Sequence, residues 1–235
     1  MYRNEHGEAI GRLKVLFFDV NETLLDISNV KQAVAELLDN KKDLADRWFN
    51  LMLQYTWMET MADRYHDFGE IGLAALHSIA KMNHIAVDPA KAIKAIVLIK
   101  EAQPHPDVEE GLHLLHEMDF NMLTLTNSSN PTIVAQLQNS GLRRWFDGML
   151  SVEDIGFYKP HRHVYRWAAN RMNVKPSECM LVAAHGWDIF GALEAGYRAA
   201  FIERPHQVLY PLADEPEIIE PDLINVAKRI IELER

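Results

Sequence analysis

The stretch LKVLFFDVNETLLD, residues 13–26, decides the fold of this 235-residue chain. Its apolar run, residues 15–18, is typical of a strand that is covered on both faces, as in a parallel sheet. The run ends at Asp19, and open α/β sheets bind their ligands at the carboxyl ends of such strands. On position alone Asp19 is equally typical of a helix N-cap or a turn, so the rest of the chain has to distinguish these interpretations.

The composition indicates a folded protein that does not bind nucleic acid. Hydrophobic residues make up 48% of the chain, enough for a substantial core, and the net charge is −10 with no basic cluster. No apolar run is long enough to span a bilayer, and the start of the chain lacks the apolar segment of a signal peptide. We therefore expect no membrane partner and a cytoplasmic location. The single cysteine, Cys179, excludes an intrachain disulfide and a cysteine-based zinc site.

The order of apolar runs and helical patterns predicts an α/β fold with an insertion. Separated by helices, four further strands are expected at residues 121–126, 146–151, 179–183 and 199–202. This order predicts a doubly wound, Rossmann-like, mostly parallel sheet formed by residues 1–25 and 105–235. Residues 26–104 carry helical periodicity with few Gly or Pro, which predicts an inserted all-helical cap domain over the carboxyl edge of the sheet.

Polar side chains follow the predicted strands where each strand ends. They are Asp19, Thr126, Asn127, Lys159, His185 and Asp188. Because the carboxyl ends of parallel strands meet at one edge of a sheet, we expect these side chains to converge. A lone lysine before proline is usually a solvated turn, and a lone histidine is more often structural than catalytic. Their joint placement in this order is much more specific than any one of them.

These motifs resemble those of the haloacid dehalogenase superfamily, and most of all its L-2-haloacid dehalogenases of type II. The resemblance covers residues 14–204. Its four motifs are Asp19 with Thr23, Thr126 with Asn127, Lys159 with Tyr165, and Trp187 with Asp188. The segment Gln54-Tyr55-Thr56-Trp57 also resembles the dehalogenase cap, and it is the most family-specific part of the match.

The resemblance implies a metal-free and cofactor-free hydrolase that acts on a small halogenated carboxylate, and a homodimer, as is common in relatives. Asp19 would displace halide from the α-carbon of a 2-haloacid and form an ester that water hydrolyses. Lys159 would hold Asp19 ionised, with Thr23 and Asn127 as hydrogen-bond partners. The fourth motif adds Asp188 to the catalytic group. The implied substrate-binding residues are Val20 and Asn21 through their backbone N–H groups, Thr126, Asn127, Phe49, Trp57, Tyr165 and Trp187.

A phosphatase of the same superfamily is the alternative enzyme. It would need an aspartate two residues after the nucleophile as general acid, and an acidic Mg²⁺ ligand four residues before Asp188. The chain has Asn21 and Ala184 at these positions. Because halide leaves as a stable anion, dehalogenation needs neither group, so the two absences favour the dehalogenase.

The predicted cap departs from the family at Phe49, where relatives usually carry an arginine that helps to bind halide and substrate. Arg47 lies two residues away, on a different helix face, and does not substitute for it. Either Phe49, Trp57 and Trp187 cradle the halide by ring-edge contact, or the substrate differs. A vestigial, non-catalytic binding protein is the third interpretation.

Two further departures border the nucleophile. Glu22 stands where relatives usually have glycine, and the Ala-Ala-His of residues 183–185 stands where they commonly have Ser-Ser-Asn. Glu22 follows Asp19 by three residues and His185 precedes Asp188 by three, so both loops lie beside the nucleophile. A Glu22–His185 pair would supply an imidazole that can deprotonate the hydrolytic water. The alternative is a solvated Glu22 and a His185 that only replaces asparagine in packing.

Overall fold

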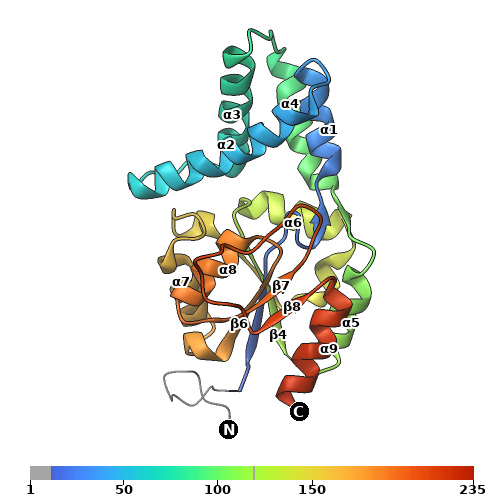
Figure 1. Ribbon diagram of the computed structural model, residues 1–235, viewed down its shortest axis with the longest axis vertical. Coiled ribbons are helices and arrows are strands. Elements are labelled where there is room, and N and C mark those ends of the chain that lie inside the picture. The colour runs from blue at the N-terminus through green and yellow to red at the C-terminus, as the bar shows by residue number, and fades with distance from the viewer. Residues whose placement is uncertain (1–11, 119) are drawn as a thin grey trace.

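The computed structural model describes residues 12–118 and 120–235; residues 1–11, the start of the predicted core domain, lie outside the described residues. Its centre is a six-stranded, all-parallel sheet (Figure 1). In spatial order the strands are β5 (Gly148–Ser151), β4 (Asn121–Thr126), β1 (Val15–Phe18), β6 (Cys179–Ala183), β7 (Arg198–Ile202) and β8 (Ile218–Glu220). The predicted doubly wound α/β fold is confirmed.

Strand β1 is the point at which the strand order reverses. It pairs with β4 on one side and with β6 on the other, and its residues are almost completely buried. The chain fills the sheet from β1 through β4 to β5, and then from β6 through β7 to β8. A reversal of this kind opens a crevice at the carboxyl ends of the strands, and Asp19 is the first residue after β1.

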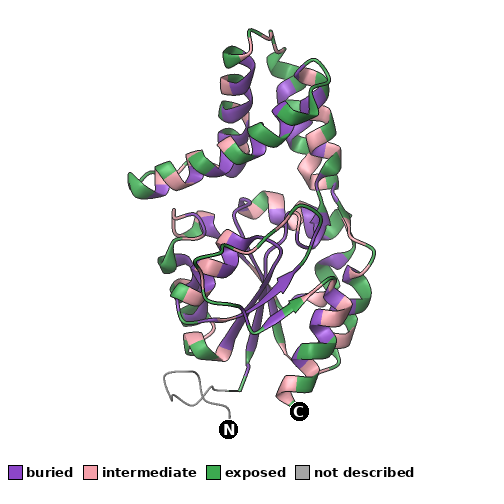
Figure 2. Cartoon of the chain, viewed as in Figure 1, coloured by how far each residue is buried: buried purple, intermediate pink, exposed green. Residues whose placement is uncertain are grey.

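Helices cover both faces of the sheet. They are α5 (Val108–His116), α6 (Asn130–Asn139), α7 (Arg162–Arg171), α8 (Gly186–Glu194) and α9 (Leu223–Glu234). Helix α5 packs against α9 on one side, and α7 packs against α8 on the other (Figure 1). Buried residues accordingly line the strands and the inner faces of these helices (Figure 2). Short 3₁₀ helices occupy Leu98–Glu101, Leu142–Trp145, Val152–Asp154 and Pro176–Glu178.

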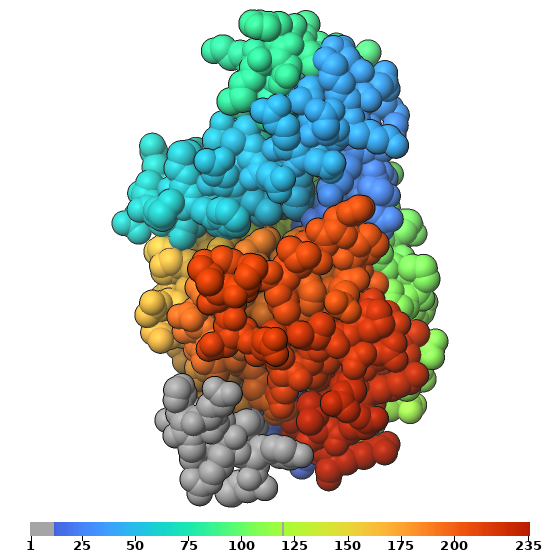
Figure 3. Space-filling view, in the orientation of Figure 1, coloured from blue at the N-terminus to red at the C-terminus, as the bar shows by residue number. Residues whose placement is uncertain are grey.

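Between residues 26 and 103 the chain forms four α-helices that gather at one end of the molecule (Figure 1). These inserted helices are α1 (Ser28–Leu37), α2 (Lys42–Met61), α3 (Phe68–Met82) and α4 (Pro89–Val97). Asp67 and Asp88 cap α3 and α4 through side-chain hydrogen bonds to backbone N–H groups, which fixes where these helices begin. In Figure 3 the atoms of α2 lie directly on those of the core. That the inserted helices form a separate cap domain, residues 26–104, stays a prediction.

The two chain segments that join the inserted helices to the sheet lie side by side. They form an antiparallel ribbon of β2 (Leu25–Asp26) and β3 (Gln103–Pro104). The His105 N–H extends this pairing by donating to the Leu24 carbonyl over 3.0 Å. None of the described helices combines the length and the apolar character needed to cross a membrane.

Three details of the predicted strands were wrong. The strands expected at residues 13–19 and 146–151 are shorter, because only Val15–Phe18 and Gly148–Ser151 pair with neighbours. Residues 199–202 were expected to form the last clear strand, yet β8 adds a further one. Its three residues pair only with β7, so it forms through an available sheet edge, without a long apolar run of its own.

Candidate active site

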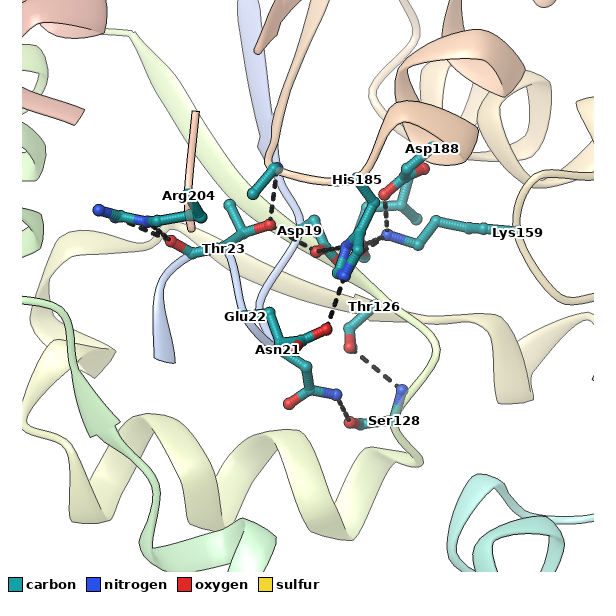
Figure 4. A network of polar contacts seen from close by, with 12 residues as sticks. Asp19, Asn21, Glu22, Thr23, Thr126, Ser128, Lys159, His185, Asp188 and Arg204 are labelled. Atoms are coloured by element: carbon teal, nitrogen blue, oxygen red, sulfur yellow. Dashed lines mark hydrogen bonds and ion pairs between the residues drawn. The ribbon is translucent and has the colours of Figure 1, made fainter. Parts of the chain in front are cut away.

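Asp19 lies in the crevice at the sheet edge and is only 5% exposed. Its two carboxylate oxygens have different partners (Figure 4). Lys159 Nζ donates to Oδ1 over 2.8 Å, and Thr23 Oγ1 donates to Oδ2 over 2.6 Å. The Thr23 hydroxyl in turn accepts from the Ala184 N–H over 2.9 Å, which ties the loop after β1 to the end of β6. The carboxylate is therefore held in one orientation.

Lys159 is completely buried and joins two carboxylates. Besides Asp19 Oδ1, its Nζ donates to Asp188 Oδ2 over 2.5 Å and to the Leu125 carbonyl over 2.8 Å, so all three ammonium hydrogens have acceptors. Burial by itself disfavours the ammonium, but the charges of Asp188 and Asp19 outweigh it and raise the pKa of Lys159. The lysine is thus a permanent cation beside Asp19.

Asp188, which contacts the lysine, is itself in contact with Tyr165. Tyr165 donates to Asp188 Oδ1 over 2.6 Å, and both side chains are fully buried. Burial raises the pKa of Asp188, against the attraction of Lys159. Helix α8 can pack this close to Tyr165 because its residue 191 is glycine. A Cβ at this position would lie 2.6 Å from the Tyr165 hydroxyl oxygen. Asp188 and Tyr165 therefore orient the lysine, and Tyr165, which the sequence assigns to substrate binding, contacts Asp188.

His185 lies between two carboxylates. Its Nδ1 is 3.1 Å from Asp19 Oδ2 and its Nε2 is 3.0 Å from Glu22 Oε2 (Figure 4). Its ring stacks on that of Trp187 with the centroids 5.0 Å apart. Burial opposes the charge, but the hydrogen bonds to Asp19 and Glu22 dominate and raise the pKa of His185 to about 9. Lys159 and His185 together lower the pKa of Asp19, against the opposing effect of burial. At neutral pH the site holds an ionised Asp19 between two cations.

The stability of the protein should fall between about pH 6.5 and pH 9, as His185 loses its proton. The imidazole titrates near pH 6.5 in the unfolded chain and at about 9 in the folded one, so its stabilising contribution is complete below the lower value and is lost as the pH rises through the upper one. We expect a decrease on the order of 2–3 kcal/mol in the free energy of unfolding. Urea unfolding across this range measures it. In His185→Asn the decrease should be absent; an unchanged decrease there would contradict the assignment.

The loop after β4 provides polar groups next to Lys159. Asn127 Oδ1 accepts from the Lys159 backbone N–H over 3.1 Å. Thr126 Oγ1 accepts from the Ser128 N–H over the same distance (Figure 4). All three residues of this loop are buried. Thr126 Oγ1 is the acceptor in its contact with Ser128, and no acceptor for its hydrogen is found among the residues that the structure describes, so the hydroxyl can donate to a bound anion.

The side chains that directly follow Asp19 are engaged in the protein. Val20 is completely buried. Asn21 Nδ2 donates to Ser128 Oγ over 3.1 Å, and its Oδ1 accepts from Gln136 Nε2 over 2.8 Å. These two side chains are therefore occupied by the protein itself, and binding of the substrate by the backbone N–H groups of Val20 and Asn21 stays a prediction.

The aromatic residues divide into two groups. Trp57 of α2 donates from Nε1 to the Lys159 carbonyl over 3.2 Å, and its ring meets Trp187 edge to face with centroids 6.2 Å apart. Phe49 instead lines an apolar cavity of about 230 Å³ between the inserted helices and the loop after β4. Other residues of this cavity are Trp48, Met52, Phe68 and Ser128. The structure thus brings Trp57 and Trp187 into contact with each other, whereas Phe49 lines a cavity whose lining includes neither of these two tryptophans.

Two cations that the sequence does not single out support the loop after β1. Lys31 Nζ lies 2.5 Å from Glu22 Oε1. Arg204 donates twice to the Thr23 carbonyl, over 3.1 and 3.0 Å, and pairs with Asp107 at 2.7 Å. No local pattern marks either residue, because each reaches its partner from another element.

The donor set around Asp19 does not suit a divalent ion. Within residues 12–118 and 120–235, no three His, Cys, Asp or Glu side chains are arranged to hold a metal. Ala184, at the position of the phosphatase ligand, contributes a methyl group and a backbone N–H. The charged groups in direct contact with the carboxylate are the cations Lys159 and His185. An ionised, fixed carboxylate of this kind can act as a nucleophile.

Comparison with known proteins agrees with this geometry. The family model described as haloacid dehalogenase-like hydrolase matches residues 13–196. The (S)-2-haloacid dehalogenase 4A of Burkholderia cepacia is 29% identical over 83% of this chain and 85% of its own. The solved structure of the L-2-haloacid dehalogenase from Xanthobacter autotrophicus with chloropropionic acid covalently bound has a TM-score of 0.85 at 22% identity, covering 93% of this chain and 98% of that one. A dehalogenase structure with an intermediate complex has a TM-score of 0.84 at 26% identity, covering 94% and 98%.

Proposed function

The chain belongs to the haloacid dehalogenase-like hydrolases, and from this premise we propose that it hydrolyses the carbon–halogen bond of short-chain 2-haloalkanoic acids to give 2-hydroxy acids. The observation that carries the proposal is the 2.8 Å contact between Asp19 at the sheet edge and the buried ammonium of Lys159. A carboxylate that is kept ionised and oriented suits attack on carbon. Relatives named (S)-2-haloacid dehalogenase support the substrate class.

In the first half of the reaction, a carboxylate oxygen of Asp19 forms a bond to the α-carbon of the substrate. The carbon–halogen bond breaks, and its electron pair leaves with the halide. No proton has to be supplied, because halide is a stable anion. The edges of Trp57 and Trp187, the positive part of an aromatic ring, are available to the departing halide.

In the second half, water attacks the carbonyl carbon of the Asp19 ester and the hydroxy acid leaves. Ester formation removes the charge of Asp19, one of the two carboxylates that raise the pKa of His185. The ring then releases its proton to solvent and can accept one from the attacking water, while Glu22 keeps it oriented. Asp19 ends the cycle ionised and His185 protonated, so the net reaction consumes one water and releases one halide and one proton.

We assign the substrate carboxylate to the Thr126 hydroxyl and to the backbone N–H groups of Val20 and Asn21, with Asn127 beside them. Local N–H donors of this kind bind anions without a side-chain cation. They matter here because a net charge of −10 offers an anionic substrate no long-range attraction. A homodimeric state and a cytoplasmic location stay predictions.

The alternative functions have weaker support. A phosphatase of this superfamily needs an acid at position 21 and a metal ligand at position 184, and Asn21 and Ala184 supply neither. Burying a lysine between two carboxylates carries a large desolvation penalty. Catalysis by Asp19 gives a reason for such an arrangement, whereas a non-catalytic binding role does not require it.

Bromide release from 2-bromopropionate tests the proposal, with and without EDTA. We expect release that EDTA does not affect, and no hydrolysis of p-nitrophenyl phosphate. In ¹⁸O-labelled water, a single turnover should place label in Asp19, as read by peptide mass spectrometry, and leave the product unlabelled. Loss of activity with EDTA would indicate the phosphatase, and absence of bromide release the binding protein. Label only in the product would contradict the ester.

His185→Ala should accumulate the ester on Asp19. Removing the base slows hydrolysis of the ester by about 10²–10³-fold, whereas displacement of halide needs no base. Intact-protein mass spectrometry after mixing with 2-bromopropionate should detect the adduct. His77→Ala, which removes an exposed histidine of α3, is the matched control and should show no accumulation. Normal turnover of His185→Ala would disprove the role of the histidine.

A further inference from the structure

The backbone of Glu22 has an unusual conformation that directs its side chain into the site. Its φ is 60°, in the left-handed region that favours glycine and that other residues adopt only at a cost in free energy. The loop is held there by the Glu22 N–H, which donates to the Leu25 carbonyl over 2.8 Å, and by the Glu22 carbonyl, which lies 3.2 Å from His105 Nε2. A strained residue whose half-buried carboxylate faces the site points to a function of the side chain itself.

Each oxygen of the Glu22 carboxylate has its own cation. Oε2 faces His185 Nε2 at 3.0 Å, and Oε1 faces Lys31 Nζ at 2.5 Å. Both cations lower the pKa of Glu22 against the opposing effect of burial. Lys31 belongs to α1, one of the inserted helices, and its ammonium also lies 5.0 Å from the centre of the Phe49 ring. A continuous line of polar contacts therefore runs from an inserted helix to the nucleophile.

We propose that Lys31 is a positioning residue for hydrolysis of the ester: it holds Glu22, and through Glu22 it holds the ring of His185 beside Asp19. This inference rests on the proposed function. Lys31 touches no reacting atom, so its effect is confined to the step that uses His185. The hydrolytic half of the reaction thereby depends on α1 being seated over the sheet edge, while formation of the ester does not.

The charges around His185 explain why a cation is useful at this position. Three cations balance three anions in the free enzyme: Lys31, Lys159 and His185 against Asp19, Glu22 and Asp188. His105, which contacts the Glu22 carbonyl, adds no positive charge to this balance, because burial and the charge of Arg204 lower its pKa. When the ester forms, one anion disappears and the cluster carries an excess positive charge. Lys31 then favours loss of the proton from His185, because its positive charge weakens the stabilisation of the protonated ring by the Glu22 carboxylate.

A simple clamp between helix and core is the competing interpretation. The side chains of Lys31 and Glu22 are 29% and 13% exposed, and a partly exposed ion pair contributes little to the stability of the folded protein. Loss of a clamp would loosen the whole crevice and slow both halves of the reaction. Loss of a positioning residue would slow one half and change its pH dependence.

Rapid mixing with 2-bromopropionate separates the two halves, because bromide release reports ester formation and intact-protein mass reports ester hydrolysis. In Lys31→Met we expect bromide release within about twofold of the wild-type rate, and ester hydrolysis about tenfold slower at neutral pH. The acidic limb of the hydrolysis rate should move to higher pH. Lys31→Arg should restore both properties, and Lys42→Met, at an exposed lysine of α2, should change neither.

Unchanged ester hydrolysis in Lys31→Met would overturn the role of Lys31, and so would equal slowing of both halves without rescue by Lys31→Arg. In either case wild-type bromide release leaves the proposed function intact. If the wild-type protein releases no bromide, the proposed function fails and the role of Lys31 fails with it.

Discussion

Asp19→Asn should lower bromide release from 2-bromopropionate by at least about 10⁴-fold. An amide is a far weaker nucleophile than a carboxylate, and removing the nucleophile of a covalent mechanism has effects of this size in other hydrolases. The loss should appear in the rate of ester formation itself, so that no adduct is detected by intact-protein mass. Steady-state bromide release and a single-turnover mass measurement together check it.

Asp39→Asn is the matched control for this substitution. Asp39 is exposed, and its φ of 56° is a conformation that asparagine adopts readily, so the change should leave both activity and folding intact. A circular dichroism spectrum shared by the wild type and Asp19→Asn would exclude unfolding as the cause of inactivity. Retention of more than about one per cent of activity in folded Asp19→Asn would place the nucleophile elsewhere.

Lys159→Met should lose both activity and stability. The substitution keeps the length of the side chain but removes the cation that lies between the Asp19 and Asp188 carboxylates. Breaking a buried ion pair on one side costs about 3–5 kcal/mol, which urea unfolding at neutral pH should measure. Two such carboxylates hold a proton more tightly in the folded state than in the unfolded one. The stability of this variant should therefore recover relative to wild type as the pH falls below neutral.

A double substitution distinguishes the two effects of losing Lys159. Lys159→Met with Asp188→Asn removes the repulsion, so we expect stability to return in part while bromide release stays low. Lys94→Met, at an exposed lysine of α4, is the control and should behave as wild type. Near-normal turnover of Lys159→Met would refute the role of the lysine in holding Asp19.

The sheet could be predicted where strands carry their own signal. Strands β4 and β6 have the expected limits, because β4 alternates apolar residues with β-branched threonines, β6 is an apolar run, and both are buried almost throughout. The pairing of β8, and the two-residue strands β2 and β3, could not be predicted. Such short segments become strands only because a partner backbone lies within hydrogen-bonding distance, and that proximity is a property of the tertiary fold.

The polar residues at strand ends could be placed in one crevice because parallel strands fix where their carboxyl ends meet. This argument brings Asp19, Lys159 and Asp188 together, and the structure has them in direct contact. It does not predict the contact of Lys31 with Glu22, because that contact depends on how α1 packs over the core. It also does not predict that Phe49 lines the apolar cavity while Trp57 contacts Trp187, because positions along α2 do not reveal the neighbours of each ring.

The antiparallel ribbon of β2 and β3 has an evolutionary consequence. Paired strands lie about 5 Å apart, so the chain leaves the sheet and returns to it at almost the same point. A segment with adjoining ends can be exchanged for one of another length or shape without rethreading the remaining backbone. Selection can therefore diversify what covers the crevice while Asp19 and its partners, all outside this segment, stay unchanged.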